Sequence, residues 1–220
     1  MNENHSHPAP RGISLLVLGA LLALACQPAG AVLHAEHSLR YLGWMGLKPV
    51  TVEITLRARP RDMFEYREWI APRWWAGFFG EPEMHETMLR AEDSDFRPVI
   101  HTSWSGEAVD LQTLPDEVVD LLLVRLEARA DIASGVRQAD YAVWQDDGTI
   151  ETWRLEVTGD ETVETPDARY RALTFELGNK DHSIRGWSAP LLAFHFVRLE
   201  FWEGQDRVGV LELAEKELWE

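Results

Sequence analysis

Alternation of apolar and polar residues is the main structural signal along the chain, and it predicts strands. Residues 64–70 alternate between apolar and charged side chains, which is typical of a strand with one buried face. Residues 50–56 are mostly β-branched, and the turn-forming residues 60–62 (Pro-Arg-Asp) separate the two segments. We therefore expect residues 50–56 and 64–70 to form a hairpin.

The same signal recurs in the second half of the chain. Residues 140–144 and 149–158 flank Asp147-Gly148, a dipeptide that favours a tight hairpin turn. Gly159-Asp160 predicts another turn, and Pro98 predicts an edge strand or a bulge where it interrupts an extended run. The remaining extended segments are residues 96–104, 169–177, 193–203 and 207–213.

One helix is expected among these strands. An apolar stripe at helical spacing runs from Val118 to Leu126, and a capping residue precedes Pro115 near the first turn. Gly135 is a suitable C-terminal stop. The pattern therefore predicts a helix over residues 115–133.

Eight or nine strands around one helix define the expected fold class. Short connections between neighbouring strands imply antiparallel pairing, and a twisted antiparallel sheet of this size tends to curl. We therefore predict a mainly β protein: a curled antiparallel sheet that forms an open or half barrel, with one helix packed on it.

The N-terminus carries the features of a secretory signal. Residues 13–25 are an unbroken apolar run that follows Arg11, and a membrane span needs about 20 such residues. The small residues Ala29-Gly30-Ala31 form a cleavage site. We expect a signal peptide over residues 1–31 and a single β-rich domain over residues 32–220.

The location that follows is the periplasm, with one alternative. Cys26 comes directly after the apolar run and could instead become a lipidated N-terminal residue, which would make the protein a membrane-anchored lipoprotein. Cys26 is the only cysteine, so the expected domain contains no disulfide and no thiolate zinc site. No later stretch is long enough to form a transmembrane span after signal cleavage.

Charge and motifs exclude several classes of function. The formal net charge of −16 argues against binding to nucleic acid, which requires Lys and Arg to neutralise phosphates. Nucleophile, phosphate-loop and dinucleotide motifs are absent, so we expect no catalytic residue and no cofactor. We interpret the histidines of the domain as ordinary strand or surface residues, with a metal site assembled from several strands as the alternative. Those considered are His85, His101, His182 and His195.

The most unusual segment covers residues 69–79, which contain five large aromatic side chains interrupted by Pro72 and Gly77. Clusters of this kind mark interaction sites when they are exposed, and the alternative is a core plug at a barrel mouth. We predict that these residues line or close an apolar opening that binds an apolar ligand or an envelope protein. They are Trp69, Trp74, Trp75, Phe78 and Phe79.

Several short segments form a recognisable set. They are Gly46-Leu47-Lys48, Tyr66, Phe96-Arg97-Pro98, Leu114-Pro115-Asp116, residues 161–166 before residues 170–173, Trp187-Ser188-Ala189-Pro190 and Glu212. With these segments the chain resembles an uncharacterised family of exported bacterial proteins catalogued as domain of unknown function 3108. The resemblance covers most of residues 37–217. It implies a β-rich exported domain with no established activity, and therefore supplies no functional residues.

These observations support three functional hypotheses. The first is a non-enzymatic periplasmic protein that binds an apolar ligand or an envelope partner. The second is an enzyme that acts on cell-wall or surface polysaccharide, which a pocket containing two facing carboxylates with a raised pKa would favour. The third is a structural envelope assembly factor without a pocket.

Overall fold

The computed structural model describes residues 36–219 except 74–80, 93–94, 103–107 and 146. The expected signal peptide, with both cleavage alternatives, lies outside the described residues. Within them, no helix is both long enough and apolar enough to cross a membrane.

A single sheet of thirteen strands makes up most of the described chain, in the order β6-β5-β4-β3-β2-β1-β13-β12-β11-β10-β9-β8-β7. Neighbours are antiparallel except for β7 and β8, which are parallel. The strands are β1 (His37–Met45), β2 (Lys48–Arg59), β3 (Met63–Pro72), β4 (Glu83–Glu92), β5 (Asp95–Thr102), β6 (Ala108–Asp110), β7 (Val118–Asp120), β8 (Gln138–Trp144), β9 (Ile150–Glu164), β10 (Arg169–Gly178), β11 (His182–Ala189), β12 (His195–Glu203) and β13 (Asp206–Leu218).

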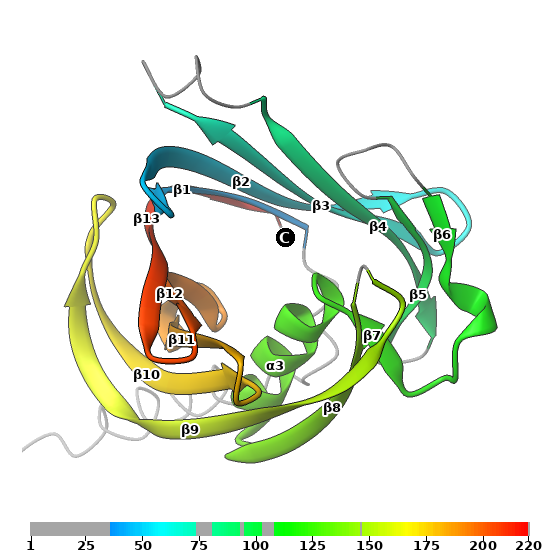
Figure 1. Cartoon of the computed structure of the whole chain (residues 1–220). Helices are drawn as coiled ribbons and strands as arrows, with labels where there is room; N and C mark the ends of the chain where they lie inside the picture. Colours follow the sequence, from blue (N-terminus) through cyan, green and yellow to red (C-terminus); the bar gives the residue numbers. More distant parts are fainter. Residues whose placement is uncertain (1–35, 74–80, 93–94, 103–107, 146, 220) are drawn as a thin grey trace, which may run out of the picture.

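The sheet curls around one helix, α3 (Leu123–Ser134), which lies inside the curl in Figure 1. Within the described residues, two short 3₁₀ helices are also present, η2 (Leu111–Thr113) and η3 (Pro190–Leu192). The sheet is not closed into a barrel by hydrogen bonding, because β6 and β7 remain its two edges. The predicted fold class, a mainly β protein with a curled open sheet and one packed helix, is confirmed for the part of the chain that the structure describes.

The number of strands was underestimated. β6 and β7 contain three residues each, too few to show a period of two. In β4, the positions on the face toward α3 include the polar residues His85 and Thr87, so that strand shows no apolar alternation. The expected turn at Gly159-Asp160 was also wrong, because β9 runs through it and Gly159 pairs with Thr174 beside a bulge.

The helix begins later than its apolar stripe suggested. Val118 and Val119 belong to β7 and pair with Ala142 and Val143 of β8, where their β-branched side chains are buried. Pro115 lies in a turn closed by a hydrogen bond from the Val118 amide, so it does not open the helix. The stop at Gly135 is confirmed: this residue has a left-handed φ of 90° at the helix C-cap.

Other local predictions are confirmed by the register. β2 pairs with β3, and β8 pairs with β9, as the turn residues indicated. The pairing of β4 with β5 shifts between Leu89, opposite Pro98, and Met88, opposite Ile100, which places a bulge beside the proline. β12 begins two residues later than expected, because Ala193 and Phe194 adopt left-handed φ values of 47° and 61°.

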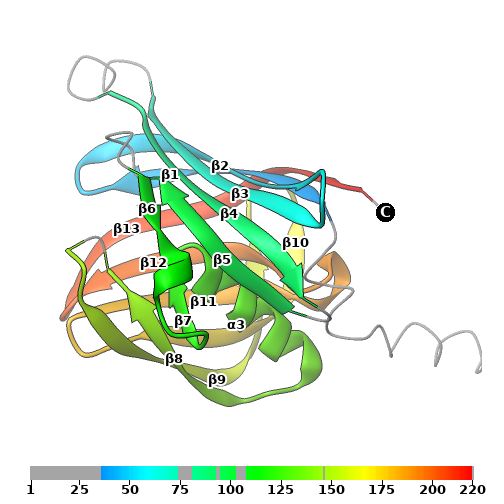
Figure 2. The ribbon, with the colours of Figure 1, turned by 90° about the vertical axis from the view of Figure 1, so that its right-hand side faces the viewer.

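The core lies inside the curl, between α3 and the concave face of the sheet. Leu123 and Leu126 of the helix are buried together with Leu155, Phe175 and Leu199 of the strands. Figure 2, turned by 90°, shows α3 covered by strands on both sides. The core fills one part of the curl and leaves the other part for the cavity described next.

A candidate ligand-binding cavity

A cavity of about 710 Å³ occupies one mouth of the curled sheet. Its lining includes Gly46, in the β1–β2 turn, and Glu203, at the end of β12, which are both exposed, so the cavity opens to solvent. Apolar side chains from β1, β9, β11, β12 and the loop between β7 and α3 form much of the wall. They include Met45, Leu121, Trp153, Ile184, Phe201 and Trp202.

A buried ion pair lies on the wall of this cavity. Arg125 of α3 donates from Nη1 and Nη2 to the two carboxylate oxygens of Glu68 on β3, at 2.8 and 3.0 Å. Burial alone would raise the pKa of Glu68, but the charge and hydrogen bonds of Arg125 lower it below its usual value. The carboxylate is therefore ionised at neutral pH and is held by the helix.

A second polar cluster joins the two ends of the sheet. Asp120 at the end of β7 accepts a hydrogen bond from the Thr87 hydroxyl of β4, and its Oδ2 lies 3.1 Å from Nδ1 of His101 on β5. Its Oδ1 accepts from the backbone amides of Leu122 and Leu123 at the start of α3. Burial would raise the pKa of Asp120, but these hydrogen bonds and His101 lower it.

This cluster does not have the geometry of a nucleophile triad. In a Ser-His-Asp arrangement the hydroxyl and the carboxylate contact opposite nitrogens of the imidazole. Here Thr87 Oγ1 lies 3.0 Å from Nδ1 of His101, the same nitrogen that faces Asp120. The carboxylate therefore holds both residues in place and does not activate the hydroxyl through the ring.

Deeper in the curl, a buried histidine contacts a buried arginine. Nη1 of Arg129 lies 2.7 Å from Nδ1 of His195, and the rings of His195 and His37 are 4.4 Å apart. Burial lowers the pKa of Arg129 to about 10, so it is still charged at neutral pH. Burial, together with the positive charge of Arg129, holds the pKa of His195 well below its ordinary value.

The free energy of unfolding should therefore decrease as the pH is lowered, before the pH reaches the range in which carboxylates titrate. An unfolded His195 binds a proton as the pH drops through about 6.5, whereas the folded side chain stays neutral, so unfolding is favoured by up to about 1.4 kcal/mol per pH unit below that value. Chemical denaturation at pH 7.5, 6.5 and 5.5 measures this loss. The His195→Gln variant should show a smaller slope, and a slope equal to the wild-type one would contradict the assignment.

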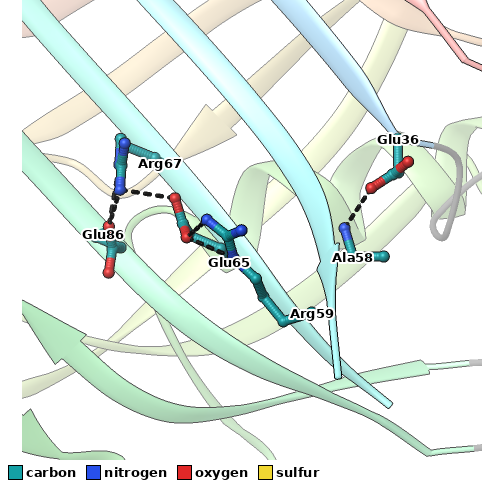
Figure 3. Close-up of polar contacts among 6 residues, drawn as sticks. All are labelled: Glu36, Ala58, Arg59, Glu65, Arg67 and Glu86. Atoms are coloured by element: carbon teal, nitrogen blue, oxygen red, sulfur yellow. Dashed lines mark hydrogen bonds and ion pairs between the residues drawn. The ribbon is translucent and has the colours of Figure 1, made fainter. Parts of the chain in front are cut away.

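The outer face of the sheet carries charge pairs centred on Glu65, which is only 6% exposed. On β2, β3 and β4, Arg67 bridges Glu65 and Glu86, at 2.7 Å to each, and Arg59 also contacts Glu65 (Figure 3). Glu36 accepts a hydrogen bond from the Ala58 amide nearby. These contacts tie neighbouring strands together on the face opposite the cavity.

Trp69 also lies on the outer face. It follows the cavity-lining Glu68 in β3, and successive strand residues point to opposite faces. The half-buried Trp69 pairs with Met84 of β4 and Glu53 of β2, and it is not among the residues that line the cavity. The other four aromatic residues predicted at this opening, Trp74, Trp75, Phe78 and Phe79, lie outside the described residues.

The histidines are more buried than expected. His101 and His195 are strand residues, one of the two interpretations given, but each is only 3% exposed and neither is a surface residue, while His85 and His182 line the cavity. No group of three or more His, Cys, Asp or Glu side chains that could hold a metal ion occurs within the described ranges.

Comparison with known proteins gives only remote likenesses. No family model and no curated protein matches the chain, so the resemblance to domain of unknown function 3108 is not confirmed. A beta-barrel-like protein of domain of unknown function 1849 from Brucella abortus has a TM-score of 0.48 and 6% identity, covering 85% of this chain and 99% of that one.

Two further solved structures are similar to the chain. A structure of the MucA/MucB complex from Pseudomonas aeruginosa has a TM-score of 0.39 and 14% identity, covering 90% of this chain and 56% of the matched one. A protein described as exported, with a YmcC-like fold, from Bacteroides fragilis has a TM-score of 0.37 and 12% identity, covering 82% and 95%. At TM-scores below 0.5 these likenesses do not indicate a function.

Proposed function

We propose that this protein is a non-enzymatic binding protein of the bacterial envelope that holds an apolar ligand in the cavity of the curled sheet. The observation that carries the proposal is the cavity itself. Its volume of about 710 Å³ lies within the range of roughly 300–1,000 Å³ that is typical of small-molecule sites. Its wall combines large apolar side chains with a few charged groups, as such sites do.

The state of the charged groups disfavours an enzyme acting on polysaccharide. Glycoside hydrolysis needs one carboxyl group whose pKa is raised so that it can donate a proton. Glu68, on the cavity wall, and Asp120, which contacts the lining residue His101, instead have a lowered pKa because each is held by hydrogen-bond donors. A structural factor without a pocket is disfavoured by the size of the cavity.

An envelope protein remains the alternative partner, at a different surface. β3 ends at Pro72 and β4 begins at Glu83, near the mouth where Gly46 lies. The half-buried Trp69 and Met84, which is 37% exposed, are adjacent apolar residues on the outer face there. Loss of partner capture in Trp69→Ala, with apolar-probe binding unchanged, would support this alternative.

Native mass spectrometry of the full chain purified from an envelope fraction tests the main proposal. A co-purifying mass of a few hundred daltons that is extracted by organic solvent is the expected result. The apolar fluorophore N-phenyl-1-naphthylamine provides a second measurement, because its emission increases when it enters an apolar site. Absence of both a bound mass and probe binding would contradict the proposal.

Filling part of the cavity should weaken probe binding. Leu121 is a half-buried lining residue, and Leu121→Trp adds bulk to the wall, so we expect the probe to bind at least about tenfold more weakly, a loss of about 1.4 kcal/mol. Leu191→Trp is the matched control, because Leu191 is 86% exposed and lies outside the lining. Equal weakening in both variants would show that the probe binds elsewhere.

A further inference from the structure

The lining of the cavity is divided into a polar sector and an apolar sector. Three neighbouring strands, β3, β4 and β5, contribute only polar side chains to the lining, which are Glu68, His85 and His101. The strands on the other side of β2 contribute large apolar side chains, and their polar lining residues lie at the ends of β11 and β12. The apolar residues are Met45, Trp153, Ile184, Phe201, Trp202 and Val208. This segregation indicates a ligand with one polar end and one apolar end.

His85 is the residue of the polar sector that a ligand can reach. It pairs with Glu68 across β3 and β4, so both side chains point to the same face of the sheet, and on that inner face Glu68 contacts Arg125 of α3. His85 is half-buried, and neither of its ring nitrogens is buried or hydrogen-bonded within the described part of the chain. The imidazole therefore presents its nitrogens to the cavity that it lines.

A ligand that covers His85 removes water from these nitrogens. A hydrocarbon gives no hydrogen bond in return, and a polar atom that is buried without a partner costs free energy. A neutral imidazole offers one donor and one acceptor, whereas the neighbouring Glu68 carboxylate only accepts and already binds both Nη atoms of Arg125. The complementary head group therefore both donates and accepts a hydrogen bond, as a hydroxyl group does.

The charges of the polar sector favour a head group without charge. Both carboxylate oxygens of Glu68 accept from Arg125, so a cationic head beside Glu68 would be repelled by the guanidinium that already occupies it. Asp120 adds a negative charge next to His101, and the whole chain has a formal net charge of −16. An anionic head would therefore also meet repulsion.

We infer that the ligand is an amphiphile with an uncharged hydroxyl head, as in a fatty alcohol or a monoacylglycerol, and that His85 binds this head. The hydrocarbon chain of the ligand packs against the apolar sector, and its hydroxyl group lies against β3 and β4. This inference rests on the proposed function and adds the class of the ligand, its orientation and the residue that selects it.

Two ligands of equal chain length, decanol and decane, test the inference. Each is used to displace N-phenyl-1-naphthylamine from the full chain at pH 8, and the ratio of their affinities is compared between the wild type and His85→Leu. Transfer of each ligand out of water is the same for both proteins, so a change in this ratio reports the contact with His85. We expect the preference for decanol to fall about fivefold in His85→Leu, as the loss of one hydrogen bond implies.

His182→Leu is the matched control for this substitution. His182 is an exposed lining residue at the start of β11, outside the polar sector, so its replacement should leave the ratio unchanged. His85→Gln keeps a donor and an acceptor and should retain most of the preference for decanol. In the wild type, the NMR signals of the His85 ring nitrogens should shift more with decanol than with decane, which tests the contact without a substitution.

The outcomes separate the inference from the proposed function. An unchanged ratio in His85→Leu, or equal shifts of the ring signals with both ligands, would overturn the inference and leave an apolar binding protein. An equal fall of the ratio in His182→Leu would overturn the assignment of the head to the polar sector. Stronger competition by decanoate or decylammonium than by decanol would also overturn the inference, since the site would then select a charged head. No binding of the probe or of any of these ligands would contradict the proposed function itself.

Discussion

Replacing Glu68 by Leu should destabilise the protein by about 3–5 kcal/mol, because it leaves the guanidinium of Arg125 buried without a counter-charge. Arg125 is 6% exposed, and both of its Nη atoms donate to Glu68. The pair joins α3 to β3 across the wall of the cavity. Urea-induced unfolding at pH 7, followed by tryptophan fluorescence, measures the loss as a lower midpoint at an unchanged slope.

A double variant shows whether the loss comes from the orphaned charge. Glu68→Leu combined with Arg125→Met removes both charges, and an apolar replacement of a buried ion pair is often neutral or stabilising. We expect it to recover most of the lost stability. Glu176→Leu, on the exposed outer face of β10, is the matched control and should leave the midpoint unchanged. A loss below about 1 kcal/mol in Glu68→Leu would mean that solvent in the cavity hydrates the freed guanidinium, as at an exposed pair.

The fold class could be predicted because hairpin turns and alternating strands are local signals. Asp147-Gly148 and residues 60–62 each join strands that pair directly. The start of α3 could not be predicted, since Val118 and Val119 fit both a helical stripe and a buried strand. What decides between the two is the pairing of β7 with β8, a contact that local sequence does not contain.

The site was harder to predict, although a signal for Glu68 exists. Phe64, Tyr66, Glu68 and Ile70 share the inward phase of β3, so Glu68 is a charge on an otherwise apolar face, next to Trp69 on the outward phase. A charged residue at an inward position, followed by an aromatic residue at an outward one, reverses the usual apolar–polar alternation and indicates a buried carboxylate. Arg125 within the apolar stripe of the helix is the matching signal, and only the fold brings the two together.

The joint between the two ends of the sheet has no local signal. Thr87, His101 and Asp120 are polar residues of β4, β5 and β7, and β7 lies at the opposite end of the sheet from the first two. Their contact depends on how far the sheet curls, which pairing rules between neighbours do not determine. Both views show the short β7 beside β5, where the curl comes round on itself (Figures 1 and 2).

Replacing Asp120 by Ala should be as costly as breaking the ion pair, about 3–5 kcal/mol, because one carboxylate serves three elements. It accepts from Leu122 and Leu123 at 3.0 and 2.7 Å, and so acts as the N-terminal cap of α3 although Leu122 occupies the cap position. It also holds Thr87 and His101. Loss of a cap alone costs about 0.5–2 kcal/mol, and each buried donor left without an acceptor adds about 1–3 kcal/mol.

The position of the loss distinguishes this role from general destabilisation. Hydrogen exchange in Asp120→Ala should increase first in β7 and in the first turn of α3, since these lose their acceptor and β7 is an edge strand of three residues. Asp120→Asn keeps one acceptor oxygen and should lose less stability than Asp120→Ala. Asp140→Ala is the control. It removes an exposed carboxylate of β8 that pairs with Arg154 of β9, and it should change neither hydrogen exchange nor the unfolding midpoint. Uniform faster exchange over all strands in Asp120→Ala would show that the carboxylate does not act as a local joint between the ends of the sheet.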